Sequence, residues 1–126
     1  MDSHAPPVLY AVDLGGCEAL AALQPEDISA AFVAALGRAG ATIVQALTHV
    51  FPGQGLTCVL ILSESHAALH TWPETGSVHI DIFSCSSRLK SLEAIDDLSR
   101  SFGARHVSVQ EIRRADGHSP QSDPPR

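Results

Sequence analysis

Residues 42–63 read TIVQALTHVF, PGQG and LTCVLILS, two β-branched and apolar runs separated by a four-residue turn cluster. This pattern predicts two strands joined as a β-hairpin. Strands with so short a connection are antiparallel, because a parallel pair needs a crossover of about a dozen residues. We therefore expect an antiparallel or mixed sheet, and the rest of the chain must supply the layer that covers it.

Three further strands and two helices are predicted on either side of this hairpin. Alternating apolar residues predict strands over residues 8–14, 77–83 and 104–112. Apolar residues at helical spacing predict one helix after Pro25, including residues 28–36, and a second helix over 89–102. The order strand, helix, strand, strand, strand, helix, strand predicts an α+β fold. We expect a two-layer sandwich, a mainly antiparallel sheet with two helices on one face.

Alternation within two strands predicts which side chains face the core. In the strand over 77–83 the aliphatic residues are expected to face inward, which leaves His79 and Asp81 on the opposite face. In the last strand the inward residues are expected to be Val107 and Val109. The apolar stripe of the second helix is expected to consist of Leu89, Leu92, Ile95, Leu98 and Phe102.

Length and composition predict a single globular domain. The 126 residues leave room for one hydrophobic core, and 44% of them are hydrophobic, which is enough to fill it. The first eight residues and residues 114–126 are rich in Pro, Ser, Asp and Gly, so we expect both ends to be disordered. The predicted organisation is one domain over 1–113 and a disordered tail over 114–126.

Charge and apolar run lengths argue against two classes of partner. Eight Lys and Arg against 14 Asp and Glu give a net charge of -6, which leaves no basic face for nucleic acid. No apolar run approaches the roughly 18 residues of a membrane span, and the first residues carry no targeting pattern. We expect a cytoplasmic protein without a nucleic-acid or membrane partner. The three cysteines are an odd, widely spaced set, and we expect reduced thiols.

Residues 64–74, ESHAALHTWPE, gather reactive side chain types between the hairpin and the next strand. We expect this segment to be a loop, because loops held by a rigid sheet are where chemistry is commonly placed. Residue types alone also allow an ordinary structural role. In that interpretation His66 and His70 lie on the exposed side of a helix turn, and Trp72 fills the core.

Three chemical interpretations of the same segment stay open. A metal site would use His66 and His70 with Cys85 or Glu74, although the Glu inside the His pair of a zincin helix is absent. A nucleophilic hydrolase would pair Ser65 or Cys85 with His70, although no Gly-x-Ser-x-Gly motif is present. In the third interpretation Ser65 attacks its own chain from a strained turn at a strand end.

A longer set of motifs resembles the prokaryotic S-adenosylmethionine decarboxylase proenzymes. The run SESHAALHTWPE over 63–74 closely resembles the self-cleavage region of that family. Further similar runs are VDLGGC over 12–17, GAT over 40–42 and DIFSC over 81–85. The resemblance covers residues 8–112 in order and with matching spacing, which is far more specific than a short pattern.

The resemblance implies that the chain cuts its own peptide bond between Glu64 and Ser65. The Ser65 hydroxyl would attack the Glu64 carbonyl to form an ester, and loss of the Ser65 α-proton would release the Glu64 carboxylate. Hydrolysis of the resulting dehydroalanine, through its imine, would release ammonia and leave a pyruvoyl group at the head of chain 65–126. This pyruvoyl group is the cofactor that we expect to form a Schiff base with the substrate amine, and no metal is expected.

The resemblance also implies roles for five more residues. His70 would transfer a proton during processing, and Thr57, where the family usually has a serine, would support that step with its hydroxyl. Cys85 would return a proton to the α-carbon of the product. Phe51 would stack on the adenine, and Glu74 would bind the ribose hydroxyls.

The activity implied is decarboxylation of S-adenosylmethionine to the aminopropyl donor of spermidine synthesis, by a homodimer of processed two-chain protomers. Two alternatives stay open. The same pyruvoyl chemistry could act on a free amino acid such as arginine or ornithine. Alternatively, the chain could be an α+β binding domain that is never processed and is not an enzyme.

Overall fold

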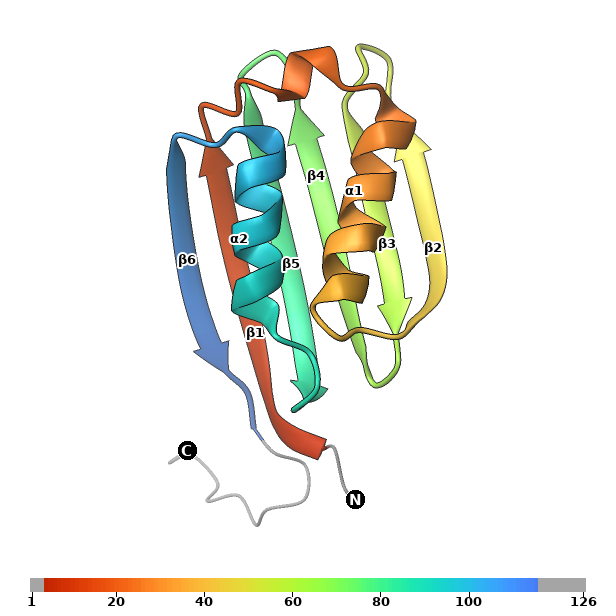
Figure 1. Cartoon of the computed structure of the whole chain (residues 1–126), viewed down its shortest axis with the longest axis vertical. Coiled ribbons are helices and arrows are strands. Elements are labelled where there is room, and N and C mark those ends of the chain that lie inside the picture. Colours follow the sequence, from red (N-terminus) through yellow and green to blue (C-terminus); the bar gives the residue numbers. More distant parts are fainter. Residues whose placement is uncertain (1–3, 116–126) are drawn as a thin grey trace, which may run out of the picture.

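The computed structural model describes residues 4–115, which form one six-stranded sheet and a layer of two helices (Figure 1). The helices are α1 (Pro25–Arg38) and α2 (Ser91–Phe102), with a short 3-10 turn, η1 (Leu20–Ala22), before α1. The strands are β1 (His4–Gly15), β2 (Ile43–Val50), β3 (Leu56–Leu62), β4 (Ser65–Trp72), β5 (Ser77–Ser86) and β6 (His106–Arg113).

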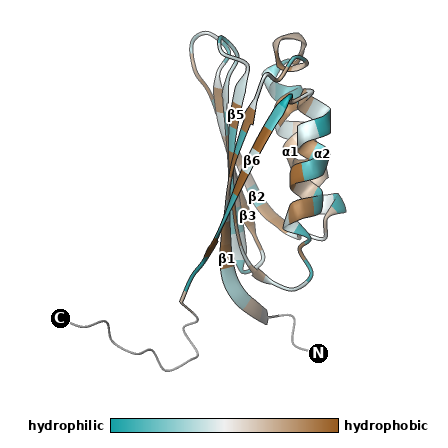
Figure 2. Ribbon diagram, turned by 90° about the vertical axis from the view of Figure 1, so that its left-hand side faces the viewer, coloured by the Kyte–Doolittle hydropathy of each residue, from teal (hydrophilic) through white to brown (hydrophobic). Residues whose placement is uncertain are grey.

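The strand order in the sheet is β2-β3-β4-β5-β1-β6, and every neighbouring pair is antiparallel. Both helices lie on the same side of the sheet (Figure 2). The predicted α+β two-layer sandwich is therefore confirmed, and its core lies between the sheet and the helices.

The predicted loop over residues 64–74 is wrong, because most of it is the strand β4. Its alternation is regular: Ala67, Leu69 and Thr71 are buried against the helices, whereas His66 and His70 lie on the opposite face. Alanine and histidine have little β-propensity, so the segment carries a weak strand signal. Pairing with β3 on one side and β5 on the other overrides that weak propensity.

The expected disorder of the first eight residues is wrong for residues 4–8, which begin β1. His4 pairs with Ser86, and the pairing becomes regular from Val8 onward after an irregularity in register. The two prolines before Val8 fall in that irregular part, where a missing N–H costs no ladder hydrogen bond. Residues 1–3 and 116–126 lie outside the described residues, so the predicted tail stays a prediction.

The core is filled by aliphatic side chains of the sheet and by one face of each helix. α1 contributes Ile28, Phe32, Ala35 and Leu36, and α2 contributes Ala94, Ile95, Leu98 and Phe102. The predicted burial of Leu92 is wrong, since 59% of it is exposed. Val107 and Val109 pair with the buried Leu14 and Val12, so both point toward the helix side of the sheet, as predicted. Both are nevertheless exposed, because β6 is an edge strand.

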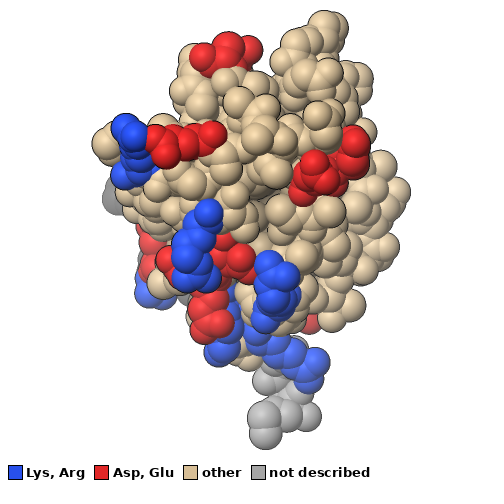
Figure 3. All heavy atoms as spheres, turned by 45° about the horizontal axis from the view of Figure 1, so that its top comes forward, with Lys and Arg blue, Asp and Glu red and all other residues tan. Residues whose placement is uncertain are grey.

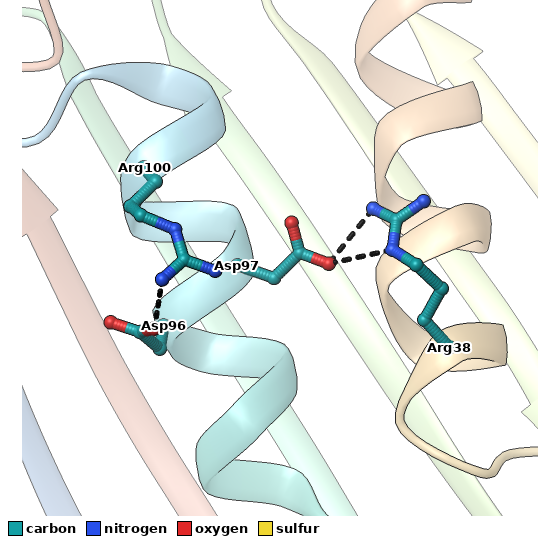
Figure 4. Close-up of polar contacts among 4 residues, drawn as sticks. All are labelled: Arg38, Asp96, Asp97 and Arg100. Carbon is teal, nitrogen blue, oxygen red and sulfur yellow. Dashed lines mark hydrogen bonds and ion pairs between the residues drawn. The ribbon is translucent and has the colours of Figure 1, made fainter.

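A cross-helix ion pair joins the outer surfaces of the two helices. Arg38 of α1 donates to one carboxylate oxygen of Asp97 on α2 through Nε at 3.0 Å and Nη2 at 2.8 Å, while Arg100 pairs with Asp96 within α2 (Figure 4). Pairs this exposed contribute about 0–1 kcal/mol each. The apolar contacts beneath them therefore account for most of the stability of this layer.

The described cysteines are all free thiols, as expected from their number and spacing. Cys17 and Cys58 are buried, whereas Cys85 is half-buried. Burial raises the pKa of the Cys17 thiol, which keeps that thiol protonated at neutral pH. Of the three, Cys85 is the one that solvent reaches.

The second face of the sheet, which we call the open face, has no helix over it among the described residues (Figure 2). Register places polar and apolar side chains on it together, since residues directly opposite one another share a face. His79 and Asp81 lie on it, as predicted, and both side chains are exposed in the single chain. Apolar members of the open face are Leu9, Leu47, Val59, Ile61, Phe83 and Ile112.

On the face shown in Figure 3 most Lys and Arg lie in the lower half, several of them beside Asp and Glu, whereas the top and the right carry Asp and Glu alone. Among residues 4–115 no helix has the length and apolar character needed to cross a bilayer.

Two glycines offer a matched test of the packing between α1 and the segment before α2. Gly40 has a φ of +104°, and a Cβ there would overlap the carbonyl oxygen of Arg88. Gly37 lies at the end of α1, and a Cβ there would meet nothing within 4 Å. We expect Gly40→Ala to lower the free energy of unfolding by at least ~2 kcal/mol, from left-handed strain and overpacking together.

Gly37→Ala is the control, and it should raise the free energy of unfolding by about 0.5–1 kcal/mol, because alanine is the better helix former. Urea unfolding of the two variants and the parent protein measures both values. Equal effects of the two substitutions would contradict the close approach of Arg88 to Gly40.

Candidate active site

The bond between Glu64 and Ser65 lies in the tight turn that joins β3 to β4. Glu64 has a φ of +62°, a left-handed conformation that costs a residue with a side chain about 1–2 kcal/mol. The turn is short because Ser65 already pairs with Leu62 across the hairpin. The strain is thus located at the residue that contributes the carbonyl of the bond.

Cys85 of β5 contacts both sides of the same bond. The Cys85 thiol donates a hydrogen bond to the Glu64 carbonyl oxygen at 2.6 Å, and the Cys85 backbone N–H donates to Ser65 Oγ at 3.4 Å. The register of β4 and β5 explains this position, since His66 pairs with Phe83 and the residues two positions further outward are Glu64 and Cys85. A donor on the carbonyl oxygen makes the carbonyl carbon more electrophilic. We call Glu64, Ser65 and Cys85 the cleavage corner.

A hollow of about 260 Å³ opens beside the cleavage corner. Its walls include Glu64 and Ser65, the turn over residues 40–42, and Arg88 and Leu89 from the segment before α2. The turn between β3 and β4, which contributes to the wall of this hollow, lies where β4 begins (Figure 1).

A second hollow, of about 310 Å³, lies at the other end of β4. It brings together four residues that the sequence singles out, Phe51, Thr57, His70 and Glu74, and it adds Trp72. We call this second hollow the aromatic hollow. Phe51 and Glu74 come from the turns after β2 and β4, whereas Thr57 and His70 are cross-strand partners on β3 and β4.

Hydrogen bonding and ring contacts hold His70 in place within the aromatic hollow. The Nδ1 atom of His70 lies 2.9 Å from the hydroxyl oxygen of Thr57. The ring of Trp72 lies 6.1 Å from that of His70 and 4.6 Å from that of His79, measured between centroids. This arrangement leaves Nε2 as the ring nitrogen of His70 that is free of a hydrogen bond within the described chain.

The cleavage corner and the aromatic hollow are separate in one copy of the chain. Ser65 and His70 are five residues apart on an extended strand, roughly 16 Å at about 3.3 Å per residue. Strand alternation also places them on opposite faces, because Ser65 lies opposite the buried Leu62 and His70 opposite Thr57. Within one chain, therefore, His70 does not reach Ser65.

This separation overturns several interpretations that residue types had left open. His66 and His70 are not on a helix turn; they lie roughly 13 Å apart along β4, too far to share a metal ion. Within residues 4–115 no group of three or more His, Cys, Asp or Glu side chains is placed to hold a metal. A Ser65–His70 or Cys85–His70 dyad does not form within one chain. Trp72 is 41% exposed on the open face and does not fill the core.

Sequence reasoning missed two residues near the candidate sites. Trp72 could have been found, because recognition of β4 as a strand places it on the face of His70, two residues away. Arg88 carries no sequence signal, since it comes from an irregular segment and lines the hollow beside the cleavage corner only in the folded chain.

The fold is that of an α+β two-layer sandwich with paired reactive residues at both ends of one central strand. Residues 9–115 match the family model described as S-adenosylmethionine decarboxylase, and the chain belongs to this family. This result confirms both the resemblance noted in the sequence and the prediction that the protein is an enzyme, an S-adenosylmethionine decarboxylase.

Individual relatives agree with the family match. The chain is 34% identical over 102 residues, 81% of each chain, to the S-adenosylmethionine decarboxylase proenzyme of Pelotomaculum thermopropionicum. It is 36% identical over 103 residues to the proenzyme of the same description from Methanococcus maripaludis, covering 82% of this chain and 84% of the relative. The crystal structure of the adenosylmethionine decarboxylase from Aquifex aeolicus shares the fold, with a TM-score of 0.76 at 24% identity over 94% of this chain and 99% of that one.

Proposed function

We propose that this chain cuts itself between Glu64 and Ser65 and that the cut protein decarboxylates S-adenosylmethionine to the aminopropyl donor of spermidine synthesis. The observation that carries the proposal is the strained Glu64, whose carbonyl accepts a hydrogen bond from the Cys85 thiol. The word proenzyme in the names of the relatives supports a processing step in those proteins.

Self-cleavage consumes one water molecule and no other reactant besides the chain itself. Ser65 Oγ attacks the Glu64 carbonyl carbon, the C–N bond breaks, and the hydroxyl proton passes to the freed amine, which gives an ester. Removal of the Ser65 α-proton then breaks the bond between Ser65 Cβ and the ester oxygen, and Glu64 leaves as a carboxylate. Water replaces the nitrogen of the resulting dehydroalanine, and ammonia departs. The strained φ of Glu64 favours the first step, since breaking the peptide bond relieves it.

The residues of the cleavage corner fit a pyruvoyl group at position 65. That group supplies an electron sink for the bonding electrons of the departing carbon dioxide. Cys85 lies directly beside this position and holds a thiol proton there, so it suits the return of a proton to the substrate α-carbon. The thiol is half-buried, which limits competition from bulk water.

The aromatic hollow suits the nucleoside part of the substrate. Phe51 is 48% exposed and offers an aromatic ring for stacking on adenine, and His70 lies in the same hollow. The Glu74 carboxylate is an acceptor for paired ribose hydroxyls. Arginine and ornithine have neither a nucleobase nor a ribose diol, so the hollow favours S-adenosylmethionine over these amino acids.

A second copy of the chain is needed to join the two halves of the site. We expect two copies to stack their open faces about a two-fold axis, which brings the cleavage corner of one copy to the aromatic hollow of the other. Exposed Leu47, Ile61 and Ile112 supply apolar contact area for this association. In the uncut strand, residue 65 is held on the side of the sheet that faces the helices. Cleavage makes it a chain end, which is then free to turn toward the open face. The proposed active form is thus a homodimer of two-chain protomers.

Purified wild-type protein tests this proposal. Mass spectrometry should find chains 1–64 and 65–126, the second with a carbonyl group that reacts with phenylhydrazine. Release of labelled carbon dioxide should be rapid from carboxyl-labelled S-adenosylmethionine and at background from labelled arginine and ornithine. A single intact chain would overturn the self-cleavage proposal, and preferential release from an amino acid would overturn the substrate. The cytoplasmic location and the absence of nucleic-acid and membrane partners stay predictions.

A further inference from the structure

The hollow beside the cleavage corner has one cationic residue among its described lining residues, Arg88. The same lining includes Glu64 and Ser65, the two residues of the bond that we propose is cut. The backbone of Arg88 is held firmly there. Its N–H donates to the Ser86 hydroxyl at 3.1 Å, and its carbonyl oxygen abuts Gly40.

The guanidinium of Arg88 has no partner among residues 4–115. Four other arginines of the same region each pair with a carboxylate; they are Arg38, Arg100, Arg105 and Arg113. The Glu64 side chain likewise has no cationic partner in the described part of the chain. An arginine and a carboxylate thus border one hollow of the uncut chain without being paired.

Self-cleavage changes the charge at this place. The neutral amide carbonyl of Glu64 becomes an α-carboxylate, so Glu64 then bears two negative charges on one residue. Two carboxylates so close repel each other unless a cation lies nearby. Arginine is the side chain best suited to this task, because its planar fork binds a carboxylate through two parallel hydrogen bonds.

We propose that Arg88 binds the α-carboxylate of Glu64 that self-cleavage creates, and so anchors the end of chain 1–64 beside the pyruvoyl group. This inference rests on the proposed self-cleavage. Arg88 stabilises the Glu64 carboxylate as it leaves in the elimination step, and it keeps the new chain end in the hollow afterwards.

The carboxylate of the substrate is the competing ligand for Arg88, and the chemistry disfavours it. During decarboxylation the bond between the α-carbon and the carboxylate carbon breaks, and the negative charge of the carboxylate moves into the electron sink. A cation bound tightly to it would stabilise the ground state more than the transition state and would slow the reaction. The Glu64 α-carboxylate keeps its charge throughout and has no such conflict.

The test compares Arg88→Gln with Lys90→Gln in two backgrounds, the self-cleaving chain and the uncut Ser65→Ala chain. Lys90 is a nearby exposed cation outside the lining of the hollow, so its substitution is the matched control. In the cleaving background, Arg88→Gln should raise the unfolding equilibrium constant of the cut protein by about tenfold or more, as expected for a lost charge-assisted pair. In the uncut background the two substitutions should have the same small effect, and Arg88→Lys should retain part of the stability of the cut protein.

Three outcomes would overturn the assignment. Equal destabilisation of cut and uncut protein by Arg88→Gln would mean a purely structural role. An effect no larger than that of Lys90→Gln in both backgrounds would mean no role. Unchanged stability with a raised KM for S-adenosylmethionine would assign Arg88 to the substrate. A wild-type chain that is never cut would instead contradict the proposed function. The intact mass of the wild-type protein tests this point independently of the Arg88 variants.

Discussion

Ser65→Ala should leave the chain in one piece and should reduce carbon dioxide release by at least about 10³-fold, to the level of a blank. Alanine has no oxygen to attack the Glu64 carbonyl, so neither the cut nor the carbonyl group at position 65 can form. The fold should survive, because Ser65 is half-buried at a strand end and its hydroxyl accepts one long hydrogen bond, from the Cys85 N–H at 3.4 Å.

Denaturing gels and the intact mass give the fraction of uncut chain, and circular dichroism checks the fold. Ser63→Ala is the matched control, since Ser63 lies in the same turn but is not one of the two residues joined by the bond that is cut. Ser63→Ala should therefore be cut and active. A cut Ser65→Ala protein would refute the role of the Ser65 hydroxyl.

Mixing two inactive variants should restore cleavage, because the proposed dimer takes the two halves of each site from different copies of the chain. His70→Ala alone should slow cleavage by about 10²–10⁴-fold, the usual contribution of a general acid or base. Ser65→Ala alone should not be cut. In a mixed dimer the intact Ser65 of the His70→Ala chain meets the intact His70 of the Ser65→Ala chain, so one complete site forms.

Co-expression of the two variants with different affinity tags checks this expectation. The His70→Ala chain should be cut at close to the wild-type rate in the doubly purified dimer, while the Ser65→Ala chain stays whole. The control is each variant co-expressed with itself under a second tag. If mixed dimers form and the His70→Ala chain is still uncut, then His70 does not act across the interface. A protein that stays monomeric in sedimentation would contradict the dimer itself.

The fold could be predicted largely from local patterns. The hairpin over residues 42–63 required antiparallel pairing, and helical spacing located α1 and α2. The strand β4 was missed because alanine and histidine propensities do not reveal pairing with strands that are distant along the chain. The predicted direction of the Val107 and Val109 side chains in β6 was correct. Their burial was not, since only the strand order shows that β6 is at the edge of the sheet.

The candidate site divides in the same way. Motif similarity identified Ser65, His70 and Cys85, and the structure brings Ser65 and Cys85 into contact through the register of β4 and β5. It does not bring His70 to them, because four intervening residues of extended backbone separate the two groups. Spacing in a sequence counts residues, whereas distance depends on whether those residues form a helix or a strand.

The amino-acid sequence by itself determined the class of fold, the family, and the side chains available for chemistry, because these depend on residue types and their periodicity. Only the tertiary structure decided that those side chains fall into two separate groups, that Glu64 has a left-handed conformation, and that Arg88 lines the hollow beside the bond. The physical reason is that each of these features depends on strand pairing and on a close approach between segments far apart in sequence, such as Gly40 and Arg88.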